Sequence, residues 1–147
     1  MAKVMLALST FRRSEKAEEA AFERAAGGEL IVVFVADVNL GRYLADTDLG
    51  LYPELKERYF EEVLQIHRAR GEEVAAALAK RASERGISAR VNVFVGRFAL
   101  KCLEVVASER PDVIVTTRSK RPAWLKKLFG APVDYLIQHA GCPVIEA

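Results

Sequence analysis

Short runs of valine, isoleucine and leucine alternate with longer amphipathic segments along the chain, and this alternation limits the possible folds more than any other feature. The five apolar runs are Val4–Leu8, Leu30–Val35, Val91–Val95, Val113–Val115 and Pro143–Ile145. The first four are continuous, which is typical of strands covered on both faces. Strands and helices that alternate in this way predict a mostly parallel sheet with right-handed crossovers and helices on both faces.

Four amphipathic segments between these strands carry the start and stop signals of helices. Ser14 is placed to cap the first, which ends before Gly27, and the third stops before Pro111. The second would be about 50 Å long at ~1.5 Å per residue, which is unusual for a small domain. The predicted helices are Ser14–Ala26, Pro53–Arg85, Ala99–Ser108 and Pro132–Ala140. With the first strand central, we expect a single open, doubly wound, three-layer α/β/α domain over residues 1–147, with strand order 3-2-1-4-5.

The composition and charge exclude several classes of protein. With 51% hydrophobic and 29% charged residues, the chain is typical of a soluble domain, and no apolar run approaches the ~20 residues of a membrane-spanning helix. The net charge of +2 is too small to favour nucleic acid or an anionic membrane as the main partner. Cys102 and Cys142 have neither metal-ligand nor disulfide-framework spacing, which suits a reducing compartment. We therefore expect a cytoplasmic protein.

The motifs of the common enzymes with this type of sheet are absent from the sequence. It contains neither G-x-G-x-x-G nor G-x-x-x-x-G-K-[ST]. A receiver domain needs acids after the first strand, where Ser9 and Thr10 stand, and an aspartate after the third, where Gly96 stands. His67 has no second histidine or cysteine within metal-ligand range. His139 is either a general base or, as we favour, a cap at the end of the last helix. We expect no catalytic residue and no metal site.

A ligand site in a sheet of this kind lies beyond the carboxyl ends of the strands. The residues there after the first three strands are Ser9, Thr10, Val35, Asp37 and Gly96. After the fourth strand, residues 118–127 carry five basic side chains and no acid. This basic loop is either a site for a phosphate group or an acidic protein partner, or a solvated surface loop. Trp124 within it is either a stacking surface or an anchor for the loop.

The sequence resembles the universal stress protein A family over nearly its whole length. The resemblance lies in KVMLALST, VVFVADV, VFVGRFALKCLEVVASERPDVIVTTR and, most specifically, GAPVDYLIQHAGCPVIEA. Family members that bind ATP carry a glycine, two residues, a second glycine, nine residues, and a third glycine followed by Ser or Thr. Here Gly130 matches the third glycine, but Thr117 and Lys120 stand at the first two, and Ala131 takes the Ser/Thr position. Ser9 stands where the family has an acid.

These departures weaken the ATP site that the resemblance implies. Glycine allows positive φ and a concave nest of backbone N–H groups, which a Cβ at positions 117 and 120 obstructs. We therefore expect a regulatory binding protein of the stress response that binds ATP weakly or not at all. The alternative is an adenine-nucleotide binder that holds ATP or AMP through the basic loop. The candidate nucleotide- or anion-binding residues are Ser9, Thr10, Val35, Asp37, Gly96, Thr117, Arg118, Lys120, Gly130 and Ala131.

The resemblance also implies a homodimer. The sequence GCPVIEA ends as a short apolar strand with Glu146 as its only charge, and an open sheet edge of that kind is usually covered or paired. Universal stress proteins often join their last strands antiparallel. We expect Val144, Ile145 and Glu146 to meet their symmetry mates, with Ile145 at the centre and Leu136 packing beneath.

The connection over residues 37–52 and the long helix after it exceed what a minimal domain of this kind needs. Both are candidates for a lid or a partner contact. The plainer alternative is a surface excursion that Leu44, Leu49 and Leu51 hold to the core.

Overall fold

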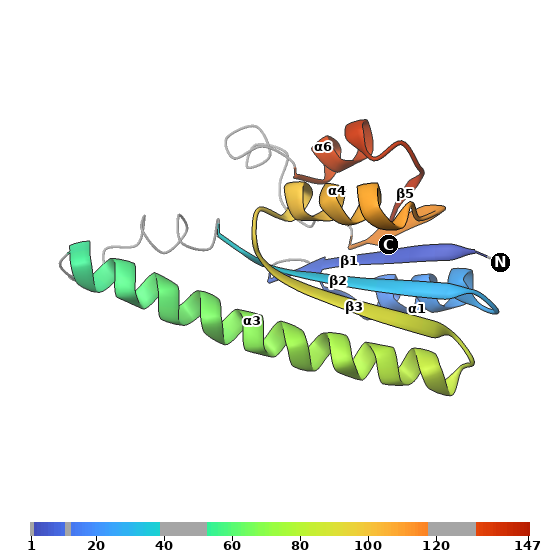
Figure 1. The fold of residues 1–147 in the computed structure, drawn as a ribbon, viewed down its shortest axis with the longest axis horizontal. Helices are drawn as coiled ribbons and strands as arrows, with labels where there is room; N and C mark the ends of the chain where they lie inside the picture. Colours follow the sequence, from blue (N-terminus) through green and yellow to red (C-terminus); the bar gives the residue numbers. More distant parts are fainter. Residues whose placement is uncertain (1, 11–12, 39–52, 118–131) are drawn as a thin grey trace.

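The computed structural model describes residues 2–10, 13–38, 53–117 and 132–147, in which helices flank a sheet (Figure 1). Every predicted strand and helix is present, and each end lies within three residues of its predicted position. The elements are β1 (Lys3–Ser9), α1 (Glu15–Ala25), β2 (Glu29–Asp37), α3 (Pro53–Glu84), β3 (Ser88–Gly96), α4 (Phe98–Glu109), β4 (Val113–Thr116), α6 (Pro132–His139) and β5 (Val144–Glu146).

The five strands form one parallel sheet in the order β3-β2-β1-β4-β5, which confirms the predicted fold class and topology. β1 lies at the centre, with Lys3 opposite Glu29 of β2 and Val4 opposite Val113 of β4. β3 pairs with β2 along nine residues, whereas β5 pairs with β4 along only three. The described sheet therefore has a long edge at β3 and a short edge at β5.

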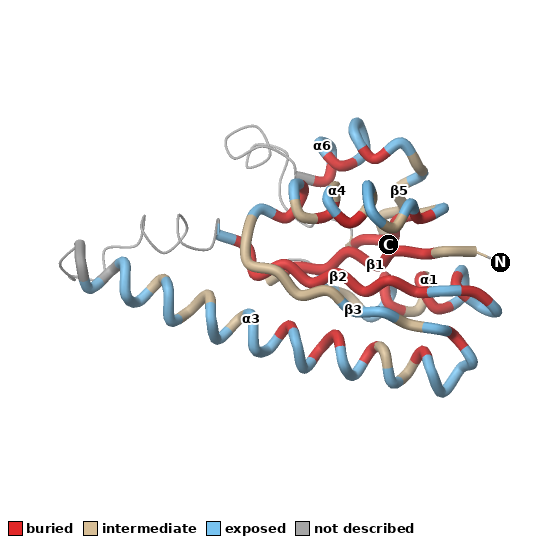
Figure 2. Tube along the Cα trace, viewed as in Figure 1, coloured by how far each residue is buried: buried red, intermediate tan, exposed pale blue. Residues whose placement is uncertain are grey.

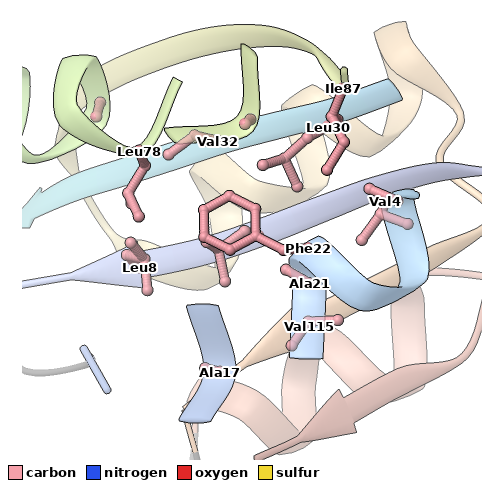
Figure 3. Close-up of a cluster of buried hydrophobic side chains, with 14 of the residues drawn as sticks. Val4, Leu8, Ala17, Ala21, Phe22, Leu30, Val32, Leu78, Ile87 and Val115 are labelled. Atoms are coloured by element: carbon pink, nitrogen blue, oxygen red, sulfur yellow. The ribbon is translucent and has the colours of Figure 1, made fainter. Parts of the chain in front are cut away.

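Alternate side chains of the central strands fill two cores, one on each face of the sheet. Leu6 and Leu8 of β1 belong to the core that includes residues of α1 and α3. Figure 3 shows the ring of Phe22 in this core, with Leu8 and Leu78 nearby. Met5 belongs to the opposite core, with residues of α4 and α6. Because both faces of the central strands are apolar, helices must cover the sheet from both sides.

The exposure of β3 contradicts the expectation that the first four strands are covered on both faces. β1 and β2 are buried almost throughout, but every residue of β3 is half-buried or exposed, and Val91 is 44% exposed. The reason is the position of β3 at the end of the sheet, where α4 packs against residues of β1 and β2. A continuous run of apolar residues therefore does not by itself show that a strand is central.

α3 packs on the sheet with only its second half. Figures 1 and 2 show its first half extending past the carboxyl ends of the strands, with largely exposed or half-buried residues. The exposed side chains in that half include Leu55, Tyr59 and Ile66. Burial begins at Gly71 and continues along one side of the helix. None of the described helices, α3 included, is both long and apolar enough to cross a bilayer.

An ion-pair network joins α1 to α3. The Glu18 carboxylate is 3% exposed and accepts hydrogen bonds from Arg13 Nε and Arg81 Nη1, both at 3.2 Å. Ser14 caps α1 as predicted, since its Oγ accepts a hydrogen bond from the Ala17 N–H at 3.2 Å. Arg13 and Ser14, directly before α1, are thus held by a buried carboxylate and by a helix cap, respectively.

Candidate functional site

Hydrogen bonds join the carboxyl ends of β1, β2 and β3 at one end of the sheet, here called the carboxyl edge. The Thr10 N–H donates to the Val35 carbonyl oxygen at 3.2 Å, and the Asp37 N–H donates to Thr10 Oγ1 at 3.4 Å. The Val38 N–H donates to the Gly96 carbonyl oxygen at 3.0 Å. These bonds bring together four of the predicted site residues, which come from three separate parts of the chain.

Ser9 and Asp37, the polar residues that end β1 and β2, are almost fully buried. Ser9 is 2% exposed and Asp37 is 5% exposed, whereas Thr10 is half-buried. Ser9 supplies a neutral hydroxyl where the family resemblance predicts an acid. Ser9 is therefore a neutral group that can donate and accept hydrogen bonds at this end of the sheet.

The end of β4 is anchored to both neighbouring strands. Thr116 is fully buried, its Oγ1 donates to the Ala7 carbonyl oxygen at 2.9 Å, and its own carbonyl oxygen accepts from the Ala147 N–H at 2.9 Å. Thr117 follows, half-buried, at the position of the first glycine in the ATP-binding pattern. The remaining predicted site residues lie outside the described part of the chain, as does the basic loop 118–127: Arg118, Lys120, Gly130 and Ala131.

Two basic residues beside Gly96 were not predicted as part of the site. Arg97 is exposed at the N-cap of α4 and makes no side-chain capping bond. The Lys101 side chain covers Gly96, since a Cβ built on Gly96 would lie 2.7 Å from Lys101 Cε. Both cations lie at the positive end of α4, so this part of the carboxyl edge favours an anion. The sequence could have indicated these two residues, because Arg97 and Lys101 are four positions apart, about one helical turn, directly after β3.

His139 lies at the opposite end of the sheet from these residues. α6 follows β4 and runs back toward the start of β5, so its last residue is at the amino ends of the strands. His139 Nδ1 is 2.9 Å from the Tyr135 carbonyl oxygen, and the two rings stack with their centroids 4.1 Å apart. This contact in the last turn of α6 supports the interpretation of His139 as a helix cap rather than a general base.

Cys102, Cys142 and His67 differ in burial, and the surroundings of the last two shift their pKa values in opposite directions. Cys102 is fully buried in the core. Burial, with the negative charge of Asp112 as a second cause, raises the pKa of the Cys142 thiol and so disfavours the thiolate. Burial, aided by the charge of Arg70, lowers the pKa of His67. Across the described ranges, no three histidine, cysteine, aspartate or glutamate residues gather as metal ligands would.

β5 forms the short edge of the sheet, and its hydrogen bonds show which peptide groups face outward. The Ile114 N–H donates to the Pro143 carbonyl oxygen, and the Ala147 N–H donates to the Thr116 carbonyl oxygen, both at 2.9 Å. In a parallel ladder, these bonds mean that the odd-numbered residues here face β4, so the peptide groups of residues 144 and 146 face away from it.

The residues expected at a dimer interface differ in how accessible they are. Val144, Ile145 and Glu146 are half-buried along β5. Leu136 is fully buried within its own chain, in the core beneath α6. It therefore supports this edge from inside the subunit.

The fold and the polar carboxyl edge define a doubly wound α/β protein of the class that binds ligands beyond its strand ends. Within this class the chain belongs to the universal stress protein family, whose family model matches residues 1–145. The match confirms the resemblance found in the sequence.

Solved structures of universal stress proteins share this fold. UspA from Lactobacillus plantarum has a TM-score of 0.71 and 15% identity, over 99% of this chain and 97% of that one. A universal stress protein in complex with cAMP has a TM-score of 0.64 and 13% identity, over 99% and 96% of the two chains. A family protein from Arabidopsis thaliana with AMP bound has a TM-score of 0.62 and 19% identity, over 99% and 90%. No curated protein matches the chain in sequence.

Proposed function

We propose that this member of the family is a regulatory binding protein of the stress response that binds ATP weakly or not at all. The observation that carries the proposal is Thr117, half-buried at the end of β4 where the ATP-binding pattern has a glycine. A side chain there takes up the space and restricts the backbone conformations that a nest of N–H groups needs. Lys120 and Ala131 are two further departures from the same pattern.

An adenine nucleotide with a short phosphate group, such as AMP, is the second candidate ligand. Two proteins of similar fold have been solved with cAMP and with AMP bound. One phosphate needs fewer backbone donors than a triphosphate does. Arginine and lysine side chains can hold it instead, and the chain offers Arg97, Lys101 and the basic loop 118–127 for this purpose.

Calorimetric titration with ATP, AMP and cAMP tests both candidates. The variant Thr117→Gly/Lys120→Gly/Ala131→Ser restores the glycine pattern and should bind ATP at least about tenfold more tightly than the natural chain, which corresponds to roughly 1.4 kcal/mol. The control Ala131→Ser adds the hydroxyl without freeing the backbone, so it should gain much less. Micromolar ATP binding by the natural chain would overturn the first proposal, and AMP binding that Lys120→Ala weakens would establish the second.

The proposed function includes a homodimer joined through β5. The outward peptide groups of Val144 and Glu146 support it, because an unpaired strand edge readily adds another strand. Pairing two copies of β5 around a two-fold axis covers both edges at once.

A further inference from the structure

β3 presents a row of outward peptide groups along the long edge of the sheet. The Ser88 N–H donates to the Gly28 carbonyl oxygen at 3.3 Å, and the Gly96 carbonyl oxygen accepts from Val38 at 3.0 Å. The even-numbered residues of β3 therefore face β2, and the odd-numbered residues from 89 to 95 face away from it. Among the described residues no strand pairs with this outer side. β3 contains no proline or lysine, and Arg90 is its one charged residue among the side chains that can protect an edge.

Two neighbouring side chains on this outer strand, Val91 and Asn92, remain partly exposed to solvent. Val91 is 44% exposed on the face of α3. Asn92 is half-buried on the other face, and the described residues give its side-chain amide no hydrogen-bond partner. A pocket of about 220 Å³ lies there, between β3 and α4. It is lined by Asn92, Phe94, Glu104, Val105, Ser108 and Glu109. An exposed valine and an amide without a partner, at neighbouring positions of an open edge, are what a strand on that side would cover.

We propose that β3 forms a second contact between copies of this chain, separate from the proposed β5 contact, so that a subunit using both has two neighbours. In this contact, called the β3 interface below, β3 pairs antiparallel with β3 of a second copy around a two-fold axis at Asn92. In this register Val91 lies opposite the partner subunit's Val93, and Asn92 lies opposite the partner subunit's Asn92. The odd-numbered residues exchange backbone hydrogen bonds across the axis, and each Asn92 amide gains the other as a partner. The same two-fold axis therefore gives the outward peptide groups, the Val91 side chain and the Asn92 amide a partner in the second copy.

The same register brings opposite charges of the two copies near each other at the pocket. It places the partner subunit's Arg90 opposite Phe94, beside the lining residue Glu104. The Glu104 side chain is 61% exposed and pairs with Lys101 Nζ at 3.4 Å, which leaves it accessible to a second cation. Within its own chain the Arg90 guanidinium pairs with Glu109 at 2.6 Å and with Glu29 at 3.6 Å, and its side chain is 51% exposed. It must therefore share or exchange these bonds to reach Glu104 of the partner subunit.

The helix layer next to β3 also leaves room for a second copy. α3 packs over β2 and β3, and α1 packs over β1. Arg81 reaches from α3 to Glu18 on α1, so the opposite side of α3 faces the long edge of the sheet. Residues about half a turn round the helix from Arg81 are Glu72, Ala76, Ala79 and Ser83, and the last three are small. The small side chains leave room for a second α3 beside the axis, while the Glu72 side chain, 59% exposed, lies on the same side of the helix.

Cysteine cross-linking tests the two-fold axis directly. Asn92→Cys, in a chain where Cys142→Ser removes the half-buried native thiol, should form a disulfide-linked dimer under mild oxidation. The reason is that Cβ atoms at such a non-hydrogen-bonded pair lie roughly 4.5–5.5 Å apart, close enough for a disulfide after a small adjustment. The matched control is Ser88→Cys on the same strand. In the proposed register the two copies of this residue lie roughly 26 Å apart, so they should not cross-link.

A second variant tests the β3 interface without relying on cysteine chemistry. Val91→Pro removes an outward N–H that the subunit itself does not use, so the fold should persist. In a chain that also carries Glu146→Pro, which blocks the β5 edge, Val91→Pro should raise the dissociation constant at least about tenfold in light scattering. The proposal is excluded if Asn92→Cys yields no more dimer than Ser88→Cys, or if Glu146→Pro alone is already monomeric at high concentration.

Discussion

The aromatic ring of Phe34 on β2 lies directly against Gly71 on α3, at the point where this long helix begins to pack on the sheet. A Cβ built on Gly71 would overlap Phe34 Cδ1. Phe34 is only 4% exposed, so its ring has little room to move aside. Glycine is unfavourable inside a helix, and this contact accounts for its presence here.

Gly71→Ala should therefore destabilise the protein, although alanine is the better helix former. We expect a loss of about 1–3 kcal/mol, because overpacking against the ring exceeds the ~1 kcal/mol gained in helix propensity. Urea unfolding measures the change. The double variant Gly71→Ala/Phe34→Leu should lose less than the sum of the two single variants, since the smaller side chain removes the clash. A more stable Gly71→Ala variant would show that the contact is not tight.

Glu18→Gln should also destabilise the protein, through the ion pairs between α1 and α3. Breaking a buried pair costs roughly 3–5 kcal/mol. The arginines that hold Glu18 are 54% and 42% exposed, so solvent screening reduces the expected loss to about 1–3 kcal/mol. Glu19→Gln is the matched control, because Glu19 also pairs with Arg81 but is 45% exposed. Urea unfolding should give the smaller change for Glu19→Gln, and equal changes would mean that burial of Glu18 has no energetic effect.

Glu19 predicts a dependence of stability on pH. The hydrogen bond from Arg85 is the main cause that lowers the pKa of Glu19 below 4.5; desolvation opposes it, and the charges of Arg85 and Arg81 add to it. A carboxyl group with a depressed pKa in the folded state contributes stability that is present above its unfolded pKa. That contribution is lost as the pH falls through the folded pKa.

The difference in stability between the natural chain and Glu19→Gln should therefore be constant near neutral pH and disappear in acid. Urea unfolding at a series of pH values measures this difference. NMR titration of the Glu19 carboxyl gives an independent check, and a midpoint at or above 4.5 would contradict the depressed pKa.

The order of strands and helices could be predicted from the sequence, because hydrophobic runs and helix caps are local features. The exposure of β3 at the edge of the sheet could not be predicted in this way. The valine run of β3 looks like that of β2, yet only β2 has a strand on each side. Whether a strand lies at the centre or the edge depends on where distant parts of the chain pair with it, and periodicity does not contain this information.

The candidate site shows the same limit. The positions of Thr10, Asp37 and Gly96 at strand ends follow from the order of elements, so the sequence could place them together. The Lys101 side chain over Gly96 depends on how α4 sits on the sheet, which the sequence does not give directly. The bond from Thr116 Oγ1 to the Ala7 carbonyl oxygen likewise joins residues that are far apart in the chain.

Arg110→Gly should stabilise the protein. Arg110 ends α4 in the left-handed conformation, with φ 50° and its N–H donating to the Val106 carbonyl oxygen. Glycine adopts this conformation without the steric cost that a side chain brings. We expect a gain of about 0.5–1 kcal/mol after the greater entropy of glycine in the unfolded chain is subtracted. Arg110→Ala, which removes the long side chain but keeps the Cβ that makes positive φ unfavourable, should give no such gain in thermal unfolding, and equal gains would point to a cause other than φ.

The proposed dimer contact through β5 can be tested with a proline substitution. The hydrogen bonds of β5 show that Glu146, rather than Ile145, is the residue to replace. The sequence placed Ile145 at the centre of the proposed dimer contact, but the ladder bonds of its odd-numbered neighbours show that the Ile145 N–H faces β4. Ile145→Pro therefore removes a bond inside the subunit and should lower the melting temperature even of a monomer. Glu146→Pro removes an outward N–H instead, so it should lower the average mass in light scattering and leave the intrinsic fold intact by circular dichroism. If Glu146→Pro keeps both the mass and the affinity of the natural chain, β5 is not the contact between subunits.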